Sequence, residues 1–174
     1  MKRSLIAITI LVAAAAHATT MIQLDLKTMT ERADRVVLGT VESTVSRWTA
    51  DHSAIYTDAT VRVAKSYKGA LKPGDALVVR REGGSVDGIG MRVFGAANFE
   101  RGEEVVVFAE TRGAATWVVG MAQGKLRVTA DAGGRKYVSA NLSGLQFTTT
   151  PQPQPARTLD DLEREIRTYA RSAR

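Results

Sequence analysis

The sequence of 174 residues contains no cysteine, and its two histidines are His17 and His52. Without cysteine there are no disulfides, so the stability of the fold must come from burial and hydrogen bonding alone. Lipid attachment to an amino-terminal cysteine is excluded for the same reason. One histidine beyond residue 18 cannot supply a zinc site of ordinary ligand composition, and no run has the regular aspartate spacing of a calcium loop. The sequence therefore predicts no metal site.

Long apolar runs are also missing. The run from Leu5 to Ala16 is about 12 residues long, whereas a helix needs roughly 20 to cross a bilayer. Lys2 and Arg3 precede this run, and Ala16-His17-Ala18 fits the small-x-small pattern of a signal-peptide cleavage site. We interpret residues 1–18 as a secretory signal, with an uncleaved anchor as the alternative. We expect an exported protein, periplasmic or extracellular, with no membrane segment after cleavage.

The charge balance is mild. The chain has 24 basic and 18 acidic residues, and removing Lys2 and Arg3 with the signal leaves 22 against 18, a formal charge of +4. This excess falls short of the clustered basic stripe expected of a nucleic-acid-binding protein. We expect no nucleic-acid partner. Another exported protein is the expected partner class, and the sequence does not define the oligomeric state.

Beyond the signal, the pattern is mainly that of a β protein. Residues 24–33 are predicted as a short helix, started by a capping box of Thr28 and Glu31 or one turn earlier by Asp25. β-Branched or alternating segments then follow at close spacing without intervening helices, which favours an antiparallel barrel or sandwich over a parallel α/β sheet. The predicted strands are 35–48, 57–67, 76–82, 104–110 and 116–121, with weaker candidates at 124–128 and 137–142.

Three of these segments carry specific expectations about their faces. Val37, Gly39, Val41 and Val45 are expected along one face of the first strand. In the second strand, Ala59, Val61, Val63 and Tyr67 are expected to point one way and the intervening polar residues the other. The consecutive apolar residues 105–108 predict a strand that is covered on both faces.

The carboxyl-terminal part divides into a linker and a helix. Prolines at positions 151, 153 and 155 make residues 148–156 an extended linker, so the barrel domain is expected to span residues 19–147. Residues 157–174 are predicted to be an amphipathic helix, capped by Thr158, whose apolar stripe consists of Leu159, Leu162, Ile166 and Tyr169. We expect the stripe to dock on the barrel; binding to a partner or to a membrane surface is the alternative.

A glycine-rich segment, residues 82–104, raises the question of phosphate binding. Its Gly88-Ile89-Gly90 start resembles a dinucleotide fingerprint, but Val93 occupies the position of the third glycine and no helix follows. We therefore predict that these glycines bend the sheet and bind no cofactor. Long connections often carry functional groups, so this segment is also a candidate rim for a binding groove, formed by Asp87, Arg92, Phe94, Asn98 and Phe99.

No catalytic group is predicted. The adjacent residues Asp51-His52-Ser53 point in different directions and cannot form a relay, so they are interpreted as a solvated turn. The pair Asp160/Asp161 is explained by a helix start, and the pair Glu103/Glu104 flanks a strand. A glycosidase would need two carboxyl groups that face each other across a cleft, a relation that the sequence alone does not define.

Several strand motifs resemble a known group of proteins. The chain is similar to exported bacterial proteins of unknown function in five segments: Ala33–Val41, Tyr56-Thr57 with the alternating Val61 and Val63, Tyr67-Lys68-Gly69, Gly102–Glu110 and 119–125. Those proteins in turn resemble the barrel of netrin-like and metalloproteinase-inhibitor domains, an OB-type fold. The resemblance implies a five-stranded barrel. It does not carry over inhibition through an amino-terminal cysteine, because the expected mature start is Thr19 and cysteine is absent.

The sequence thus predicts a small antiparallel OB-like β-barrel with a short amino-terminal helix and a carboxyl-terminal amphipathic helix. The expected function is that of an exported, non-catalytic binding or interaction module. Two alternatives stay open: a regulator or inhibitor of a secreted hydrolase such as a metalloprotease, and an enzyme acting on cell-envelope polysaccharide. The second would need paired carboxyl groups in an aromatic-lined groove.

Overall fold

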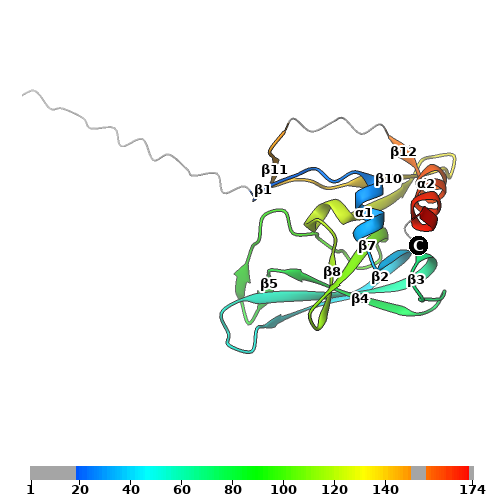
Figure 1. Cartoon of the computed structure of the whole chain (residues 1–174). Helices are drawn as coiled ribbons and strands as arrows, with labels where there is room; N and C mark the ends of the chain where they lie inside the picture. The colour runs from blue at the N-terminus through cyan, green and yellow to red at the C-terminus, as the bar shows by residue number, and fades with distance from the viewer. Residues whose placement is uncertain (1–18, 150–155, 173–174) are drawn as a thin grey trace, which may run out of the picture.

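A curled β-sheet forms the body of the protein (Figure 1). The computed structural model describes residues 19–149 and 156–172. Its main sheet has eight strands in the order β12-β10-β9-β7-β2-β3-β4-β8. The mainly β class predicted from the sequence is confirmed. The strands are β2 (Arg35–Trp48), β3 (Ile55–Lys68), β4 (Ala76–Glu82), β7 (Glu104–Arg112), β8 (Ala115–Val118), β9 (Lys125–Ala130), β10 (Lys136–Ala140) and β12 (Arg157–Thr158).

The sheet curls into an incompletely closed barrel. β8 pairs antiparallel with β7 and also meets β4, so β7, β2, β3, β4 and β8 follow one another around the curl. The contact between β4 and β8 is parallel and consists of the single pair Arg80–Trp117. β8 is only four residues long, and the first half of β7 pairs with β9 instead. The expected barrel therefore lacks a continuous closing ladder.

Strands β2 and β7 separate two hydrophobic clusters. Successive side chains of a strand point to opposite faces, and both faces are covered along residues 36–39 of β2 and 105–109 of β7. Val36 and Phe108 belong to the cluster beneath the helices, whereas Val37 and Val107 belong to the cluster inside the curl. Residues 105–109 have no exposed surface, which confirms the prediction of a strand covered on both faces.

Both predicted helices are present and pack on the same side of the sheet. In α1 (Leu26–Arg32), the Asp25 carboxylate accepts a hydrogen bond from the Thr28 amide at 2.7 Å. Asp25 is therefore the cap, and Thr28 lies inside the helix instead of starting it. In α2 (Leu159–Ser172), the Thr158 hydroxyl accepts a hydrogen bond from the Asp161 amide at 3.2 Å, as predicted for a capping residue.

Helix α2 docks on the sheet. Its stripe residues Leu159, Leu162 and Ile166 are at most 5% exposed, and Tyr169 packs against the same cluster. The Tyr67 hydroxyl of β3 donates a hydrogen bond to Glu163 at 2.8 Å. The predicted docking of the stripe is therefore observed.

Register shifts change two of the predicted faces. Leu38 pairs with Lys65 and Gly39 with Val63, so the ladder between β2 and β3 skips Ala64. The alternation of faces along β3 is therefore reversed for the residues that follow Ala64. Tyr67 consequently packs beneath α2, away from Val61 and Val63. A second shift, between Val41 and Ser43, precedes Val45, which is 43% exposed and does not share the buried face.

Short elements complete the fold. β1 (Thr19–Met21) pairs in parallel with β11 (Leu145–Phe147), and β5 (Gly84–Val86) forms a hairpin with β6 (Ile89–Met91). A 3₁₀ helix, η1 (Met121–Gly124), precedes β9. The glycine-rich segment forms the β5–β6 hairpin, which is a sheet of its own, and the loop that follows it. The predicted signal, residues 150–155 of the linker and residues 173–174 lie outside the described part of the chain. Within the described part, no helix has the length and apolar character needed to cross a membrane.

Candidate functional site

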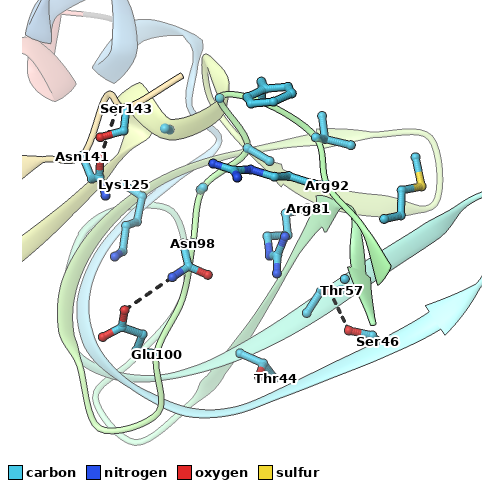
Figure 2. A pocket seen from close by; sticks show the side chains of 18 of the residues that line it. Thr44, Ser46, Thr57, Arg81, Arg92, Asn98, Glu100, Lys125, Asn141 and Ser143 are labelled. Carbon is cyan, nitrogen blue, oxygen red and sulfur yellow. Dashed lines mark hydrogen bonds between the residues drawn. The ribbon is translucent and has the colours of Figure 1, made fainter. Parts of the chain in front are cut away.

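A groove of about 920 Å³ opens at one end of the barrel (Figure 2). One wall consists of the ends of β2, β3 and β4, and a second consists of the loop that follows β6. Residues of β9, β10 and the segment after β10 contribute the remaining wall. The polar and charged side chains that line the groove are Thr44, Ser46, Thr57, Arg81, Ser85, Arg92, Asn98, Glu100, Lys125, Arg127, Ser139, Asn141 and Ser143.

The first wall arises where the interior of the barrel changes from apolar to polar. Directly paired residues on neighbouring strands present their side chains on the same face. Val61 pairs with Leu77, and both are buried in the interior cluster. Four residues further along β4, the register aligns Ser46, Thr57 and Arg81 in one row across β2, β3 and β4. This polar row is the part of the first wall that faces the groove.

The hairpin β5–β6 begins directly above this row. The Thr57 hydroxyl donates a hydrogen bond to the Gly83 carbonyl at 2.6 Å. It also lies 2.9 Å from the Ser46 hydroxyl. Because the single hydroxyl proton of Thr57 is used for Gly83, Ser46 is the donor to Thr57. Gly84 approaches these hydroxyls so closely that an added Cβ would lie 2.4 Å from each, at a φ of +147°. Only glycine allows the backbone to pass here. This glycine thus has a structural role at the edge of the groove.

Arg81 is the cation in the polar row. Leu77 and Val79 precede it on the inward face of β4, and its side chain points into the groove (Figure 2). Burial lowers the pKa of its guanidinium. Its nitrogen Nη1 donates to the Glu82 carbonyl at 3.2 Å, and no carboxylate of the described residues forms an ion pair with it. Arg81 is therefore a partly desolvated cation that lacks an acidic partner in the described part of the chain.

A second cation reaches the groove from the loop after β6. The Arg92 guanidinium carbon lies 4.9 Å from the centre of the Phe94 ring, within the range of a cation–π contact. Both residues line the groove. Arg92 is exposed, and within the described residues no carboxylate forms an ion pair with it. Within that part of the chain, no internal carboxylate competes for its guanidinium.

The opposite wall is an ion-pair network. The buried carboxylate of Glu103 binds Lys125 and also accepts from Arg127 Nε at 2.6 Å. Arg127 in turn donates to Glu100 at 2.6 Å. Burial raises the pKa of Glu103, but the hydrogen bonds from Lys125 and Arg127 oppose this and hold the pKa below its ordinary value. Burial also lowers the pKa of Lys125, with Glu103 opposing it. The network fixes both cations against the wall.

The structure brings three of the five predicted rim residues together. Arg92, Phe94 and Asn98 line the groove. Asp87 lies at the exposed tip of the β5–β6 hairpin, with a φ of +52°, and does not line the groove. Phe99 is 6% exposed and belongs to the interior cluster.

The burial of Phe99 follows from alternation along its loop. Ala97 and Phe99 point inward, whereas Asn98 and Glu100 are exposed and line the groove. The Lys125 ammonium lies 5.6 Å from the Phe99 ring. Phe99 thus supports the wall from behind.

Sequence reasoning missed the row Ser46, Thr57 and Arg81 and the pair Lys125 and Arg127. A signal for Arg81 was available, because the period of two through Leu77 and Val79 continues to position 81. No such signal exists for Lys125 and Arg127, whose position depends on the pairing of β9 with β7.

The other polar constellations lie elsewhere. Asp51-His52-Ser53 forms the exposed turn between β2 and β3, where hydrogen bonds from Thr49 and Ser53 lower the pKa of Asp51 to about 2. Glu104 pairs with Lys136 at 2.8 Å, apart from its neighbour Glu103. Among the described residues, no three histidine, cysteine, aspartate or glutamate side chains group in a way that could hold a metal ion.

Comparison with known proteins gives no assignment. No family model matches the chain, and no match is found among curated proteins.

Proposed function

We propose that this protein is an exported, non-catalytic binding module whose ligand occupies the groove at the end of the barrel. The observation that carries this proposal is Arg81, a partly buried cation that faces the groove without an acidic partner among the described residues. Removing a charge from water is unfavourable unless an opposite charge or hydrogen bonds compensate for it. A bound ligand would supply that compensation. The signal-like residues 1–18 support export.

The form of the groove also supports binding. Its volume, about 920 Å³, lies in the range of about 300–1,000 Å³ that is typical of small-molecule sites. About half of its lining residues lie in strands, where ladders and the Glu103 network fix their positions. Sites on such rigid elements hold their geometry before the ligand arrives, which lowers the entropic cost of binding.

The carboxylates of the groove favour binding over sugar hydrolysis. A glycosidase uses two carboxyl groups that face each other across the substrate. Glu100 is the one carboxylate among the described lining residues, and Arg127 occupies it at 2.6 Å. Phe94 is the one aromatic side chain among them. Among the described residues, this groove therefore lacks the paired carboxyl groups that the polysaccharide-acting alternative would need, which supports a binding function.

The test uses a variant that obstructs the groove. Gly90 lines it, and a Cβ added there meets nothing within 4 Å, so Gly90→Tyr adds bulk without a clash at its base. The matched control is Val78→Tyr on the outer face of β4, where the side chain is 48% exposed. A panel of oligosaccharides, peptides and small anions is screened by thermal shift.

We expect at least one compound to raise the melting temperature of the native protein and of Val78→Tyr, but not that of Gly90→Tyr. Stabilisation that is equal in all three proteins, or no stabilisation by any compound, would overturn the proposal. Turnover of a panel compound that is lost in Glu100→Gln would contradict its non-catalytic part.

A further inference from the structure

The charges of the groove are unevenly compensated. Among the described residues, the cations Arg81, Arg92, Lys125 and Arg127 line it, against the single carboxylate Glu100. Glu103, behind the wall, binds Lys125 and Arg127. Internal carboxylates therefore satisfy the cations of β9, whereas those of β4 and of the loop after β6 have no acidic partner in the described residues. The free positive charge is concentrated at Arg81 and Arg92.

This arrangement selects an anionic ligand group. A guanidinium presents a planar fork of N–H donors that matches a carboxylate, sulfate or phosphate in a bidentate geometry. Arg81 is partly desolvated, so its attraction to an anion is screened less than that of a fully exposed side chain. Glu100 does not compete, because it is already bound to Arg127 and to Asn98.

The rest of the lining matches a ligand rich in hydroxyl groups. The lining also contains short neutral side chains that both donate and accept hydrogen bonds, namely Thr44, Ser85, Asn98, Ser139, Asn141 and Ser143. The groove is also larger than a free inorganic anion requires and falls in the size range of multi-ring ligands. A single strand of nucleic acid would need aromatic platforms for its bases, and Phe94 is the one aromatic side chain among the described lining residues.

We propose that the groove binds an acidic saccharide, an oligosaccharide that carries carboxylate, sulfate or phosphate groups. Arg81 and Arg92 hold the anionic group, and the hydroxyl and amide side chains of the wall bind the sugar hydroxyls. The ion-paired Lys125 and Arg127 keep the opposite wall in place. This inference rests on the proposed function, because it names the ligand class of the same groove.

Isothermal titration calorimetry with defined probes tests the inference. The acidic probes are tetragalacturonate, which carries carboxylates, a sulfated heparin tetrasaccharide and a phosphorylated mannose oligosaccharide. The reference probes are neutral cellotetraose, inorganic phosphate, a glutamate-rich peptide and an oligothymidylate. The variants are Arg81→Gln and Arg92→Gln, and the matched control Arg135→Gln removes one exposed arginine from the β9–β10 turn.

We expect one acidic oligosaccharide to bind more tightly than every reference probe. Arg81→Gln should weaken this binding by about tenfold or more, the usual effect of losing a hydrogen bond to a charged group. Arg92→Gln should weaken it less, and Arg135→Gln should leave it unchanged. The acidic probe that binds most tightly identifies the anionic group. A thermal melt of each variant verifies folding; because Arg92 is exposed, its variant keeps the test decisive if Arg81→Gln does not fold.

Other outcomes overturn the inference in distinguishable ways. Binding of cellotetraose that is independent of both arginines but lost in Gly90→Tyr would leave the binding module standing and exclude the acidic ligand. The same holds if the peptide, the oligothymidylate or inorganic phosphate binds at least as tightly as every acidic sugar. Equal weakening by Arg135→Gln would show non-specific charge attraction. Absence of binding by all probes would overturn the acidic-saccharide inference, while the wider panel tests the binding module separately.

Discussion

Truncation of Phe108 to alanine tests the core on which both proposals rest. The Phe108 side chain has no exposed surface and lies in the cluster beneath α1 and α2, together with Val36 and Val106. A buried aromatic side chain removes about 200 Å² from water, which at about 25 cal/mol per Å² corresponds to roughly 5 kcal/mol, part of which the alanine retains. Measured Phe→Ala substitutions in cores cost about 3–5 kcal/mol, so we expect a loss of that size in the free energy of unfolding.

The measurement is urea unfolding followed by circular dichroism, with a thermal melt beside it. A loss of about 3–5 kcal/mol corresponds to a fall in melting temperature of roughly 6–20 °C for a domain of this size. The chain has no disulfide to offset the loss, and total stabilities are about 5–15 kcal/mol, so the variant will be marginal. Val78→Ala, on a residue that is 48% exposed, is the control and should change stability by less than about 0.5 kcal/mol. A loss below about 1 kcal/mol in Phe108→Ala would refute the burial argument.

Three further substitutions probe the groove wall and the docked helix. Glu103→Gln leaves Lys125 buried without its counter-charge and should cost about 3–5 kcal/mol in urea unfolding. The pKa of Glu103 is lower in the folded state than in the unfolded state. Its ionised form therefore contributes fully to stability at pH values above the unfolded-state pKa of about 4.3. This contribution is lost as the pH falls through the folded-state pKa. Melts at decreasing pH should show a steeper loss in the native protein than in Glu103→Gln, and parallel curves would contradict this. Gly84→Ala forces a Cβ against two hydroxyls at a φ of +147° and should lower the free energy of unfolding by about 1–3 kcal/mol. The control Gly90→Ala should lower it by less than about 1 kcal/mol. Equal melting temperatures of the two variants would refute the close approach at Gly84. Because Ile166 is buried beneath the docked α2, Ile166→Ala should lower the free energy of unfolding by about 2–5 kcal/mol. The control Thr168→Ala, at an exposed residue of the same helix, should lower it much less. Equal effects of the two substitutions in thermal melts would show that the helix is not docked.

Local patterns predicted the elements of the fold, and tertiary pairing determined their arrangement. Alternation of apolar residues located β3 and β4, and the consecutive valines identified β7 as a strand with two covered faces. The skipped residue Ala64 reverses the face of Tyr67, and nothing in the local sequence marks that position. The parallel pair β1–β11 joins segments more than 120 residues apart, which no periodicity encodes.

The candidate groove was predictable in outline only. The glycine-rich loop indicated the rim, and Arg92, Phe94 and Asn98 are there. Arg81 follows the alternating apolar residues Leu77 and Val79, so its inward direction could be predicted from the strand. Whether a carboxylate pairs with it depends on which side chains surround it after folding, and this was not predictable. Glu103 illustrates the same limit, since it binds Lys125 whereas its sequence neighbour Glu104 binds Lys136.

The position of β2 and β7 between the two clusters bears on how the molecule unfolds. Val36 and Phe108 belong to the cluster beneath the helices, and the adjacent Val37 and Val107 belong to the cluster inside the barrel. Each of the two strands therefore contributes side chains to both hydrophobic clusters. Because both clusters share these strands, we expect loss of packing on one side to loosen the side chains on the other. We therefore expect the helix layer and the barrel to unfold as one cooperative unit, so that a substitution beneath α2 also destabilises the strands that carry the groove.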